Sequence, residues 1–251
     1  MRAITLVGVA AGLLAAMPVG AQEQEVWSGR YLLLPGGVVA VENVQGDIAV
    51  EAWDRAEVEA VAVKTASGPH ADPDDARIEV ESRDRALRLR TVHSGASEGA
   101  VRVDYRLRVP RQVRLERLQT VAGNIVVGGI EGSVDARTLN GNIEQRNISG
   151  SVVATAINGS VAVSFRALPE PTAPVRLDTV NGHIFLSLPP GANADLQLST
   201  VAGRIDSKYA AAVSDTLGDT SWRTRLGRGG VQVRLRTVRG NIRVTESEDL
   251  L

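Results

Sequence analysis

The sequence contains no cysteine, few aromatic residues and almost no net charge, and each shortage excludes a class of protein. Without cysteine there is no disulfide framework, no thiolate metal site and no cysteine nucleophile. Aromatic residues make up 3% of the 251 residues, which suits a thin interior filled by Val, Ile, Leu and Ala. A formal net charge of −1 gives no overall attraction to nucleic acid or anionic lipid, so we expect no nucleic-acid partner.

Long hydrophobic runs are also missing after the first 21 residues, so we expect no transmembrane segment in the mature chain. Residues 1–21 differ from the rest. Arg2 precedes an apolar run that ends at Met17, and Pro18 is followed by the small residues expected before a signal-peptidase cut. This pattern predicts a signal peptide over residues 1–21 and an exported protein, periplasmic or extracellular. The run is too short and too rich in Ala and Gly to suit a membrane anchor.

The rest of the chain is organised by a ten-residue phrase that recurs nine times, as in LQTVAGNIVV from Leu118. The residue two places after each central glycine is β-branched, and the residue two places before it is a large aliphatic. From Gly123 to Gly159 the glycines fall every nine residues. The central glycines are Gly46, Gly123, Gly132, Gly141, Gly150, Gly159, Gly182, Gly203 and Gly240.

These columns predict a short strand, a glycine-centred corner and another short strand, with identical positions stacked on one another. TVAGNI, TLNGNI and AINGSV alternate with GIEGSV and NISGSV, so the closer resemblance recurs every 18 residues. The sequence therefore predicts an all-β fold: a parallel β-solenoid, β-helix-like, with about 18 residues per coil after an N-terminal β-rich cap region. An antiparallel sandwich with repetitive hairpins is the alternative.

The hydrophobic fraction of 43% is sufficient for a sizeable core, and no domain linker is obvious. We divide the mature chain into an N-terminal β-strand region over residues 22–117, continuous with the solenoid, the repeat solenoid over 118–245, and an acidic tail over 246–251. Alternating residues in the N-terminal region are typical of half-buried strands. HSGASEG, from His93, is predicted to join two of them as a hairpin loop.

These phrases resemble the bacterial putative-adhesin family, which comprises exported β-strand-repeat domains of unknown function. The resemblance rests on ENVQGDIAVEAWDRAEVEAVAVKTA near the start, on the repeated TV-x-G-x-I phrases, on LSLPPGANADLQLSTVAGRI from Leu186 and on the closing GGVQVRLRTVRGNIRV. It covers most of residues 38–245. The resemblance implies an adhesion-type role, and it transfers no catalytic residue.

Nonapeptide repeats raise the possibility of a calcium-binding β-roll, which needs a ladder of Asp side chains along its turns. Asp47 is the only carboxylate that directly follows a repeat glycine, so no such ladder forms. The cluster Asp72-Pro73-Asp74-Asp75 is a lone candidate for a cation site, for which a solvated turn is the favoured interpretation. We expect no metal site.

Solenoids also host polysaccharide-cleaving enzymes, which need two carboxylates about 5–9 Å apart on one face. Asp135 and Glu144 occupy equivalent positions nine residues apart, so they are expected on opposite faces of an 18-residue coil. A pair across the irregular inserts, such as Asp178 with Asp206, stays open. The three histidines are scattered at His70, His93 and His183, and no Gly-x-Ser-x-Gly elbow is present. We therefore predict no catalytic and no cofactor-binding residues.

Two polar features are candidates for binding. The stretch Arg83–Arg117 holds ten arginines and would suit an anionic polysaccharide, lipid phosphates or DNA, but interleaved acids favour ordinary solvated strands. A column of threonines would form a flat polar face, although β-propensity and side-chain hydrogen bonding explain such a ladder equally. Its members are Thr120, Thr138, Thr179, Thr200 and Thr237.

From the sequence we predict a non-enzymatic, exported β-solenoid that binds, scaffolds or adheres at the cell envelope, with an envelope protein or glycan as partner. Stacked coils would present identical side chains at ~4.8 Å intervals, which suits a repeating ligand. Two alternatives stay open. One is a regulatory or envelope-stress partner of a membrane sensor, docked through an edge strand. The other is a carbohydrate-active β-helix enzyme.

Overall fold

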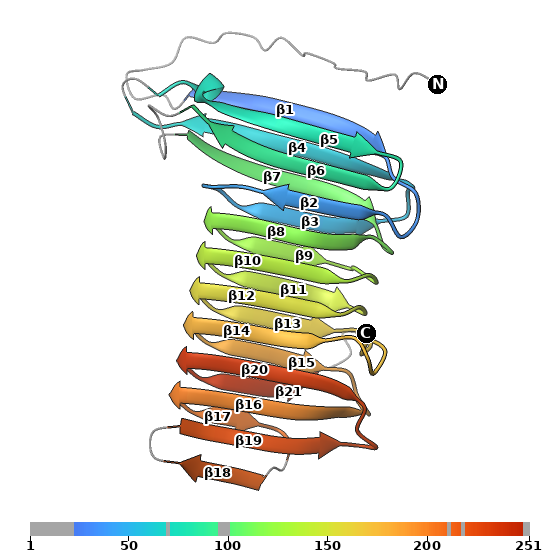
Figure 1. The fold of residues 1–251 in the computed structure, drawn as a ribbon, viewed down its shortest axis with the longest axis vertical. Coiled ribbons are helices and arrows are strands. Elements are labelled where there is room, and N and C mark those ends of the chain that lie inside the picture. The colour runs from blue at the N-terminus through green and yellow to red at the C-terminus, as the bar shows by residue number, and fades with distance from the viewer. Residues whose placement is uncertain (1–22, 69–70, 95–100, 210–211, 217–218, 248–251) are drawn as a thin grey trace.

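The computed structural model describes residues 23–68, 71–94, 101–209, 212–216 and 219–247. These residues form two β-sheets that pack against each other along one long stack (Figure 1). Apart from a single 3-10 turn, η1 (Pro73–Asp75), their regular structure consists of strands. The prediction of an all-β fold is therefore confirmed. The predicted signal peptide, residues 1–21, lies outside the described residues.

Sheet A has ten strands. In spatial order they are β1 (Glu23–Leu32), β4 (Glu57–Ala66), β7 (Val101–Pro110), β3 (Ile48–Trp53), β9 (Ile125–Gly128), β11 (Ile143–Ile148), β13 (Val161–Phe165), β15 (Ile184–Leu188), β21 (Ile242–Glu246) and β17 (Ile205–Ser207). Sheet B has eleven strands. In spatial order they are β18 (Ala212–Thr216), β19 (Asp219–Leu226), β16 (Ala194–Ala202), β20 (Val231–Arg239), β14 (Val175–Asn181), β12 (Val152–Asn158), β10 (Val134–Asn140), β8 (Arg114–Ala122), β2 (Val38–Glu42), β6 (Ala86–His93) and β5 (Ala76–Arg83).

Both sheets are mixed. The strands of the repeated phrases pair in parallel, as Val134 of β10 with Val152 of β12 and Ile143 of β11 with Val161 of β13. The antiparallel pairs lie at the two ends of the stack, where β1, β4, β5, β18 and β19 cover the last parallel strands. The antiparallel sandwich considered as an alternative is therefore wrong for the repeats.

Seven of the nine phrases contribute a strand to sheet B, turn at the glycine and contribute a strand to sheet A, whereas the phrases centred on Gly132 and Gly150 run from sheet A to sheet B. Residues hydrogen-bonded between successive layers are 18 apart in sequence from Asn124 to Asn142 and from Asn142 to Ser160. The interval grows to 23 between Ser160 and His183, because the proline-containing insert after β13 lengthens the connection. Equivalent columns nevertheless stay aligned through the stack.

The spatial order of the layers differs from their order in the chain at both ends. The last phrase of the sequence forms β20 and β21, which lie between β14–β15 and β16–β17 (Figure 1). Similarly, β2 and β3 lie between β6–β7 and β8–β9. Two segments far apart in the sequence, around Arg176 and around Arg234, therefore become neighbours in sheet B.

The corners explain why the phrases are centred on glycine. A Cβ on Gly141 would collide with the carbonyl oxygen of Gly123 in the next layer, and a Cβ on Gly159 would collide with that of Gly141. The layers approach too closely there for any side chain. Seven glycines occupy this edge of the stack, namely Gly46, Gly123, Gly141, Gly159, Gly182, Gly240 and Gly203. Gly132 and Gly150 are stacked in the same way in a separate column.

Side chains beside each corner bond the neighbouring layer. The Asn124 side-chain oxygen accepts a hydrogen bond from the Asn142 backbone N–H at 2.9 Å, and the Asn142 oxygen accepts from Ser160 at 2.8 Å. His183 continues the ladder, because its Nδ1 accepts from the N–H of Asn241 at 2.9 Å. Along this edge the polar side chains after the glycines accept hydrogen bonds from backbone N–H groups of the neighbouring layer, which the turn leaves without strand partners. The accepting residues are Asp47, Asn124, Asn142, Ser160, His183 and Asn241.

The core lies between the inner faces of the two sheets and consists mainly of Val, Ile, Leu and Ala. Tyr105 and Phe165 are the largest of its fully buried side chains. The core also contains Gln145, whose amide nitrogen and oxygen are buried and have no hydrogen-bond partner in the described part of the chain. The aliphatic composition agrees with the shortage of aromatic residues in the sequence.

Several boundaries drawn from the sequence can be placed on the fold. The predicted hairpin at His93 is wrong, because β6 belongs to sheet B and β7 to sheet A. The boundary drawn between residues 117 and 118 falls inside β8. The residues on its two sides differ in their sequence pattern but belong to the same strand. Glu246 is the last residue of β21, and residues 248–251 of the predicted acidic tail lie outside the described part.

Candidate functional site

The outer face of sheet A exposes the ring of Phe185. In β15, Ile184, Leu186 and Leu188 point into the core, so Phe185 and Ser187 point outward. Phe185 is 42% exposed, whereas the other phenylalanine of the chain, Phe165, is 2% exposed in the core. In a chain so poor in aromatic residues, an exposed ring on a regular sheet is a feature that core packing does not explain.

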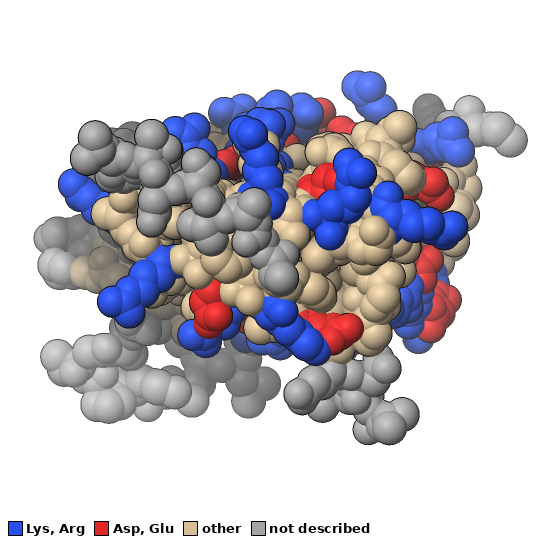
Figure 2. Space-filling view, turned by 90° about the horizontal axis from the view of Figure 1, so that it is seen from below, with Lys and Arg blue, Asp and Glu red and all other residues tan. Residues whose placement is uncertain are grey.

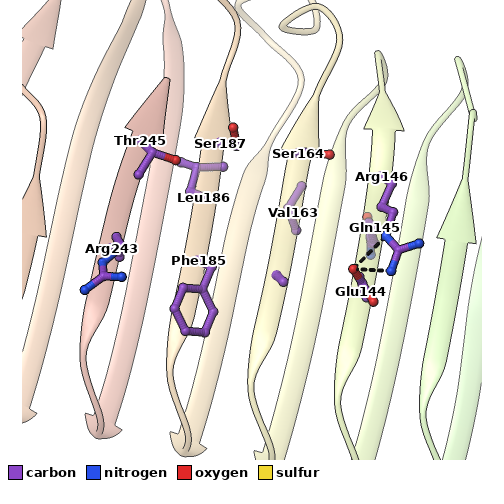
Figure 3. A pocket seen from close by; sticks show the side chains of 11 residues that line it. Glu144, Gln145, Arg146, Val163, Ser164, Phe185, Leu186, Ser187, Arg243 and Thr245 are labelled. Atoms are coloured by element: carbon purple, nitrogen blue, oxygen red, sulfur yellow. Dashed lines mark hydrogen bonds and ion pairs between the residues drawn. The ribbon is translucent and has the colours of Figure 1, made fainter. Parts of the chain in front are cut away.

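A shallow hollow of about 170 Å³ lies beside this ring (Figure 3). Ala162 and Ser164 of β13 have short side chains and form its floor, because they lie between the longer side chains of β11 and β15. Glu144 of β11 bounds the far side and is held by Arg146 at 2.6 Å. This volume is smaller than that of an enclosed small-molecule pocket, so the hollow suits part of a larger ligand lying across the sheet.

A second hollow of about 520 Å³ lies on the other side of the Phe185 ring. His183 contributes a ring whose centroid is 6.1 Å from that of Phe185. Arg243 of β21 lines both hollows, and its Nε donates to Asp206 Oδ2 at 3.1 Å. Phe185 therefore stands between two depressions, each bordered by a bonded Arg–carboxylate pair. We name this region the Phe185 trough; it is defined by Glu144, Arg146, Ala162, Ser164, His183, Phe185, Asp206 and Arg243.

The trough has the chemistry of a binding surface. The aromatic face offers apolar stacking, and the two ion pairs offer donors and acceptors held in fixed positions. The outward carboxylates Glu144 and Asp206 lie in one row of the sheet but four strands apart. At ~4.8 Å per strand this row places them about 19 Å from each other, beyond the ~9.5 Å limit of a glycosidase acid pair.

The acid pairs considered from the sequence are not brought together. Asp135 lies in β10 of sheet B and Glu144 in β11 of sheet A, as predicted for opposite faces. Val126 and Ala162 flank Glu144 in the neighbouring strands, also as predicted. The pair Asp178 with Asp206 is excluded, since β14 belongs to sheet B and β17 to sheet A.

The acidic cluster after residue 71 caps a turn. Asp72 is the N-cap of η1, its carboxylate accepts from the N–H of Asp74 at 2.9 Å, and the Asp75 carboxylate bonds back to the Asp72 N–H. This capping box agrees with the turn interpretation. No group of three or more His, Asp or Glu side chains in the described residues is arranged to hold a metal ion. His70 lies outside those residues.

The threonine column is not a binding face. Its members are buried, and each hydroxyl donates to a glycine carbonyl of the neighbouring layer, as Thr120 does to Gly46 at 3.1 Å and Thr179 to Gly159 at 2.8 Å. The column therefore stabilises the corners from inside the stack. Of the two interpretations, the structural one is confirmed.

The arginine-rich stretch does not form one basic patch either. Its residues are divided between β5, β6 and β8 of sheet B and β7 of sheet A. Six of the ten arginines have a carboxylate partner, among them Arg102 with Asp47 and Asp104 at 2.8 Å. Figure 2 shows the end of the molecule that carries β18 and β19, where basic and acidic side chains are likewise intermixed. The solvated-strand interpretation of Arg83–Arg117 is supported.

The sequence analysis did not single out Phe185. The signal was present in IFLSL, where apolar residues at alternate positions leave Phe185 on the outward face. The phrase is nearly all apolar, however, so it equally resembles a strand buried on both faces.

Two mixed sheets, stacked from glycine-cornered phrases, define an all-β repeat protein. The chain belongs to the Toastrack DUF4097 family, whose model matches residues 32–245. The residues that the structure describes include no helix long and apolar enough to span a lipid bilayer. Among curated proteins, none is significantly similar in sequence.

The solved structures to which the chain is similar are distant. A putative cell adhesion protein from Clostridium sporogenes is 11% identical, with a TM-score of 0.49, 90% of this chain covered and 100% of that one. A putative adhesin from Bacteroides fragilis is 10% identical, with a TM-score of 0.47 and coverage of 88% and 97%. A putative lipid binding protein from Parabacteroides distasonis is 10% identical, with a TM-score of 0.31 and coverage of 92% and 98%.

Proposed function

We propose that the protein is an exported, non-enzymatic binding protein of the adhesin type, which holds an envelope glycan against the outer face of sheet A. The observation that carries this proposal is Phe185, a 42% exposed aromatic ring between two hollows. Export rests on the signal-like residues 1–21.

The Phe185 trough suits a sugar polymer better than a small molecule. Both hollows are open to solvent and lie side by side on the flat sheet, so a ligand that fills both would lie along the sheet with much of its surface still in water. A pyranose ring has one apolar face that packs on an aromatic ring and hydroxyl groups at its rim. Arg146 and Arg243, each fixed by a carboxylate, can donate hydrogen bonds to such hydroxyls without first being ordered.

The stack itself supports a scaffolding role. We propose that it is a flattened β-solenoid. A coil without inserts has 18 residues, and inserts lengthen the others. Its layers repeat at ~4.8 Å, so the binding face is held by the backbone ladder rather than by loops. A rigid face loses little conformational entropy when it binds a ligand. The proposal that the protein is not an enzyme is supported by the separation of Glu144 from Asp206.

The test compares two variants of equal exposure. Phe185→Ala removes the ring, and Leu139→Ala, also 42% exposed but on β10 of sheet B, is the matched control. We expect Phe185→Ala to weaken binding to isolated envelope polysaccharide by about tenfold, since stacking on an aromatic ring contributes on the order of 1 kcal/mol or more. Leu139→Ala should bind like the wild type.

The thermal unfolding of both variants provides the check on folding. Because both side chains are exposed, each midpoint should stay close to that of the wild type. Equal binding of Phe185→Ala and the wild type would overturn the assignment of the trough. Binding to envelope protein alone, unchanged in Phe185→Ala, would favour the regulatory-partner alternative instead.

A further inference from the structure

The outer face of sheet B carries a second cluster, which forms where β14 and β20 meet (Figure 1). Arg176 of β14 is directly opposite Arg234 of β20, and Asp178 is directly opposite Arg236. All four side chains point outward, since Val175, Leu177, Val233 and Leu235 fill the inward positions of the same strands. We name these four outward residues the arginine cell.

The dimensions of the cell follow from the sheet. Neighbouring strands are ~4.8 Å apart, and residues i and i+2 on one face are about 7 Å apart. The four Cα atoms thus mark a rectangle of roughly 5 by 7 Å with a guanidinium group on three corners. Like charges directly opposite each other in a sheet are destabilising, so the pair Arg176–Arg234 has an unfavourable interaction that the fold alone does not require.

The single carboxylate leaves most of this positive charge uncompensated. Neither Arg176 nor Arg236 has an ion pair with any described residue within 4.0 Å, and Arg234 donates only to the neutral Gln197, at 3.3 Å. Burial raises the pKa of Asp178, and the nearby Arg176, Arg236 and Arg234 lower it by less. A carboxylate tightly paired with these arginines would show the opposite direction.

Two other arginines of this face are compensated. Arg137 of β10 bonds Asp135 with two hydrogen bonds of 3.0 and 2.9 Å, and Arg225 of β19 bonds Asp195 at 2.8 Å. The row that contains Arg137 leads through Thr155 to Asp178 and Arg236. The arginine cell is thus a cluster of unpaired arginines beside paired ones. Arg223 of β19, which is opposite Gln197 on the same face, likewise has no ion pair with any described residue.

We propose that the arginine cell binds a phosphate group carried on a glycan. Three arginines and one aspartate leave two net positive charges, which match a phosphomonoester dianion better than the single charge of a carboxylate. Guanidinium groups also suit phosphate oxygens geometrically. Thr155 and Gln197 adjoin the cell and have polar side chains that suit sugar hydroxyls.

A glycan is favoured over a membrane as the source of the phosphate. The immediate neighbours of the cell on this face include the polar Thr155, Gln197 and Gln232. The aliphatic neighbours are Val153, Val180 and Val238, which are only partly exposed. A surface that inserts into the headgroup region needs large, well-exposed apolar side chains such as Trp, Phe or Leu beside its basic residues, and partly buried valines do not supply them. The cell is also on the opposite sheet from the Phe185 trough, so this inference is independent of the proposed function.

The experiment is an NMR titration of the purified, ¹⁵N-labelled protein with glucose 6-phosphate, glucose, glucuronate and inorganic phosphate. We expect glucose 6-phosphate to shift backbone amide signals of β14 and β20, with affinity in the millimolar range. Inorganic phosphate should shift the same signals more weakly, and glucose should leave them unchanged. Glucuronate binding as tightly as glucose 6-phosphate would overturn the preference for phosphate.

Substitutions within the cell should change the affinity for glucose 6-phosphate in opposite directions. Arg176→Gln with Arg236→Gln should weaken glucose 6-phosphate binding by about tenfold, whereas Asp178→Asn should tighten it several-fold because it removes the repelling carboxylate. Arg137→Gln, on the same face but paired with Asp135, is the matched control and should change nothing. Phe185→Ala should also leave phosphate binding intact, which separates this site from the trough.

Two results would contradict the proposal. Equal weakening by Arg137→Gln and by the double variant would show that only general charge attraction operates. The second result is a protein that binds phosphatidic acid vesicles but neither phosphatidylcholine vesicles nor glucose 6-phosphate. That result would assign the cell to a membrane surface instead.

Discussion

The hydroxyl of Thr138 donates to the carbonyl oxygen of Gly123, 3.0 Å away in the neighbouring layer of the stack. Thr138 is 4% exposed, so this bond forms largely away from water. The same bond recurs from Thr200 to Gly240 at 2.9 Å and from Thr237 to Gly182 at 3.0 Å. It links the side chain of one layer to the corner of the next, where the glycine backbone leaves its carbonyl accessible.

Thr138→Val should lower the free energy of unfolding by about 1–2 kcal/mol. The valine keeps the shape of the side chain but cannot donate, so the Gly123 carbonyl loses its partner in a buried setting. Urea unfolding followed by circular dichroism measures the change. In β12 the column is occupied by Ala156, and Ala156→Thr should instead raise stability by up to about 1 kcal/mol. A Thr138→Val variant as stable as the wild type would contradict the role given to the ladder.

Gly141→Ala should destabilise the fold severely, by several kcal/mol. The added Cβ would collide with the backbone carbonyl of Gly123, and backbone in both layers would have to move. Gly191→Ala is a useful control, because a Cβ there meets nothing within 4 Å, although its φ of +71° carries an ordinary strain cost of about 1 kcal/mol. Thermal unfolding of the two variants distinguishes collision from strain, and similar midpoints would argue against close packing at the corners.

Gln145→Leu should stabilise the protein by about 1–3 kcal/mol. The amide of Gln145 is fully buried without a described hydrogen-bond partner, and its neighbours in the adjacent strands are Val127 and Val163. Leucine has a similar volume and no polar group that must be desolvated. Chemical unfolding provides the measurement, and a loss of stability would indicate that a water molecule satisfies the amide in solution.

Alkaline pH should destabilise the fold through Tyr105. Burial raises the pKa of its phenol from 10.0 to about 12, although the hydrogen bond with Thr91 lowers it somewhat. The unfolded chain releases this proton near pH 10, whereas the folded chain keeps it, so the stability that is present below pH 10 is lost as the pH rises towards 12. The two-unit shift corresponds to about 2–3 kcal/mol.

Tyr105→Phe provides the control for this pH dependence. The variant should lose less stability between pH 9 and pH 12 than the wild type, while burial also raises the pKa of Tyr31 and Tyr209 and leaves a residual dependence. Unfolding midpoints across this range measure both proteins. Parallel pH curves for wild type and Tyr105→Phe would show that this phenol does not govern alkaline stability.

Much of the fold could be predicted from the repeated phrases. The glycine of each phrase allows the close approach of the corners, and the β-branched residue two places later lies on the inward face of the strand that follows. The opposite placement of Asp135 and Glu144 follows from the same periodicity. These features depend on local spacing, which a single sequence contains in full.

The order of the layers could not be predicted in the same way. Leu235 and Leu177 occupy equivalent columns, so the phrase around Gly240 fits beside several others equally well. A repeat strongly specifies the register in which two strands pair, but it only weakly specifies which strand becomes the neighbour. The arginine cell depends on that choice, because Arg234 meets Arg176 only where β20 is inserted next to β14. The Arg83–Arg117 stretch is dense in arginine along the sequence, which indicated a candidate binding site. In the structure most of these arginines are paired with carboxylates and they are divided between two sheets.

The most direct test of the account is a salt-titrated pull-down of purified wild type, Phe185→Ala and Leu139→Ala with envelope fractions of the source cell, in which bound glycan and bound protein are both identified. The account predicts that wild type and Leu139→Ala capture glycan saturably and still do so at high salt, because stacking on Phe185 is not screened by ions. It also predicts that Phe185→Ala binds glycan with about tenfold lower affinity. Capture that disappears between low and moderate salt, or that is identical in all three proteins, would contradict it.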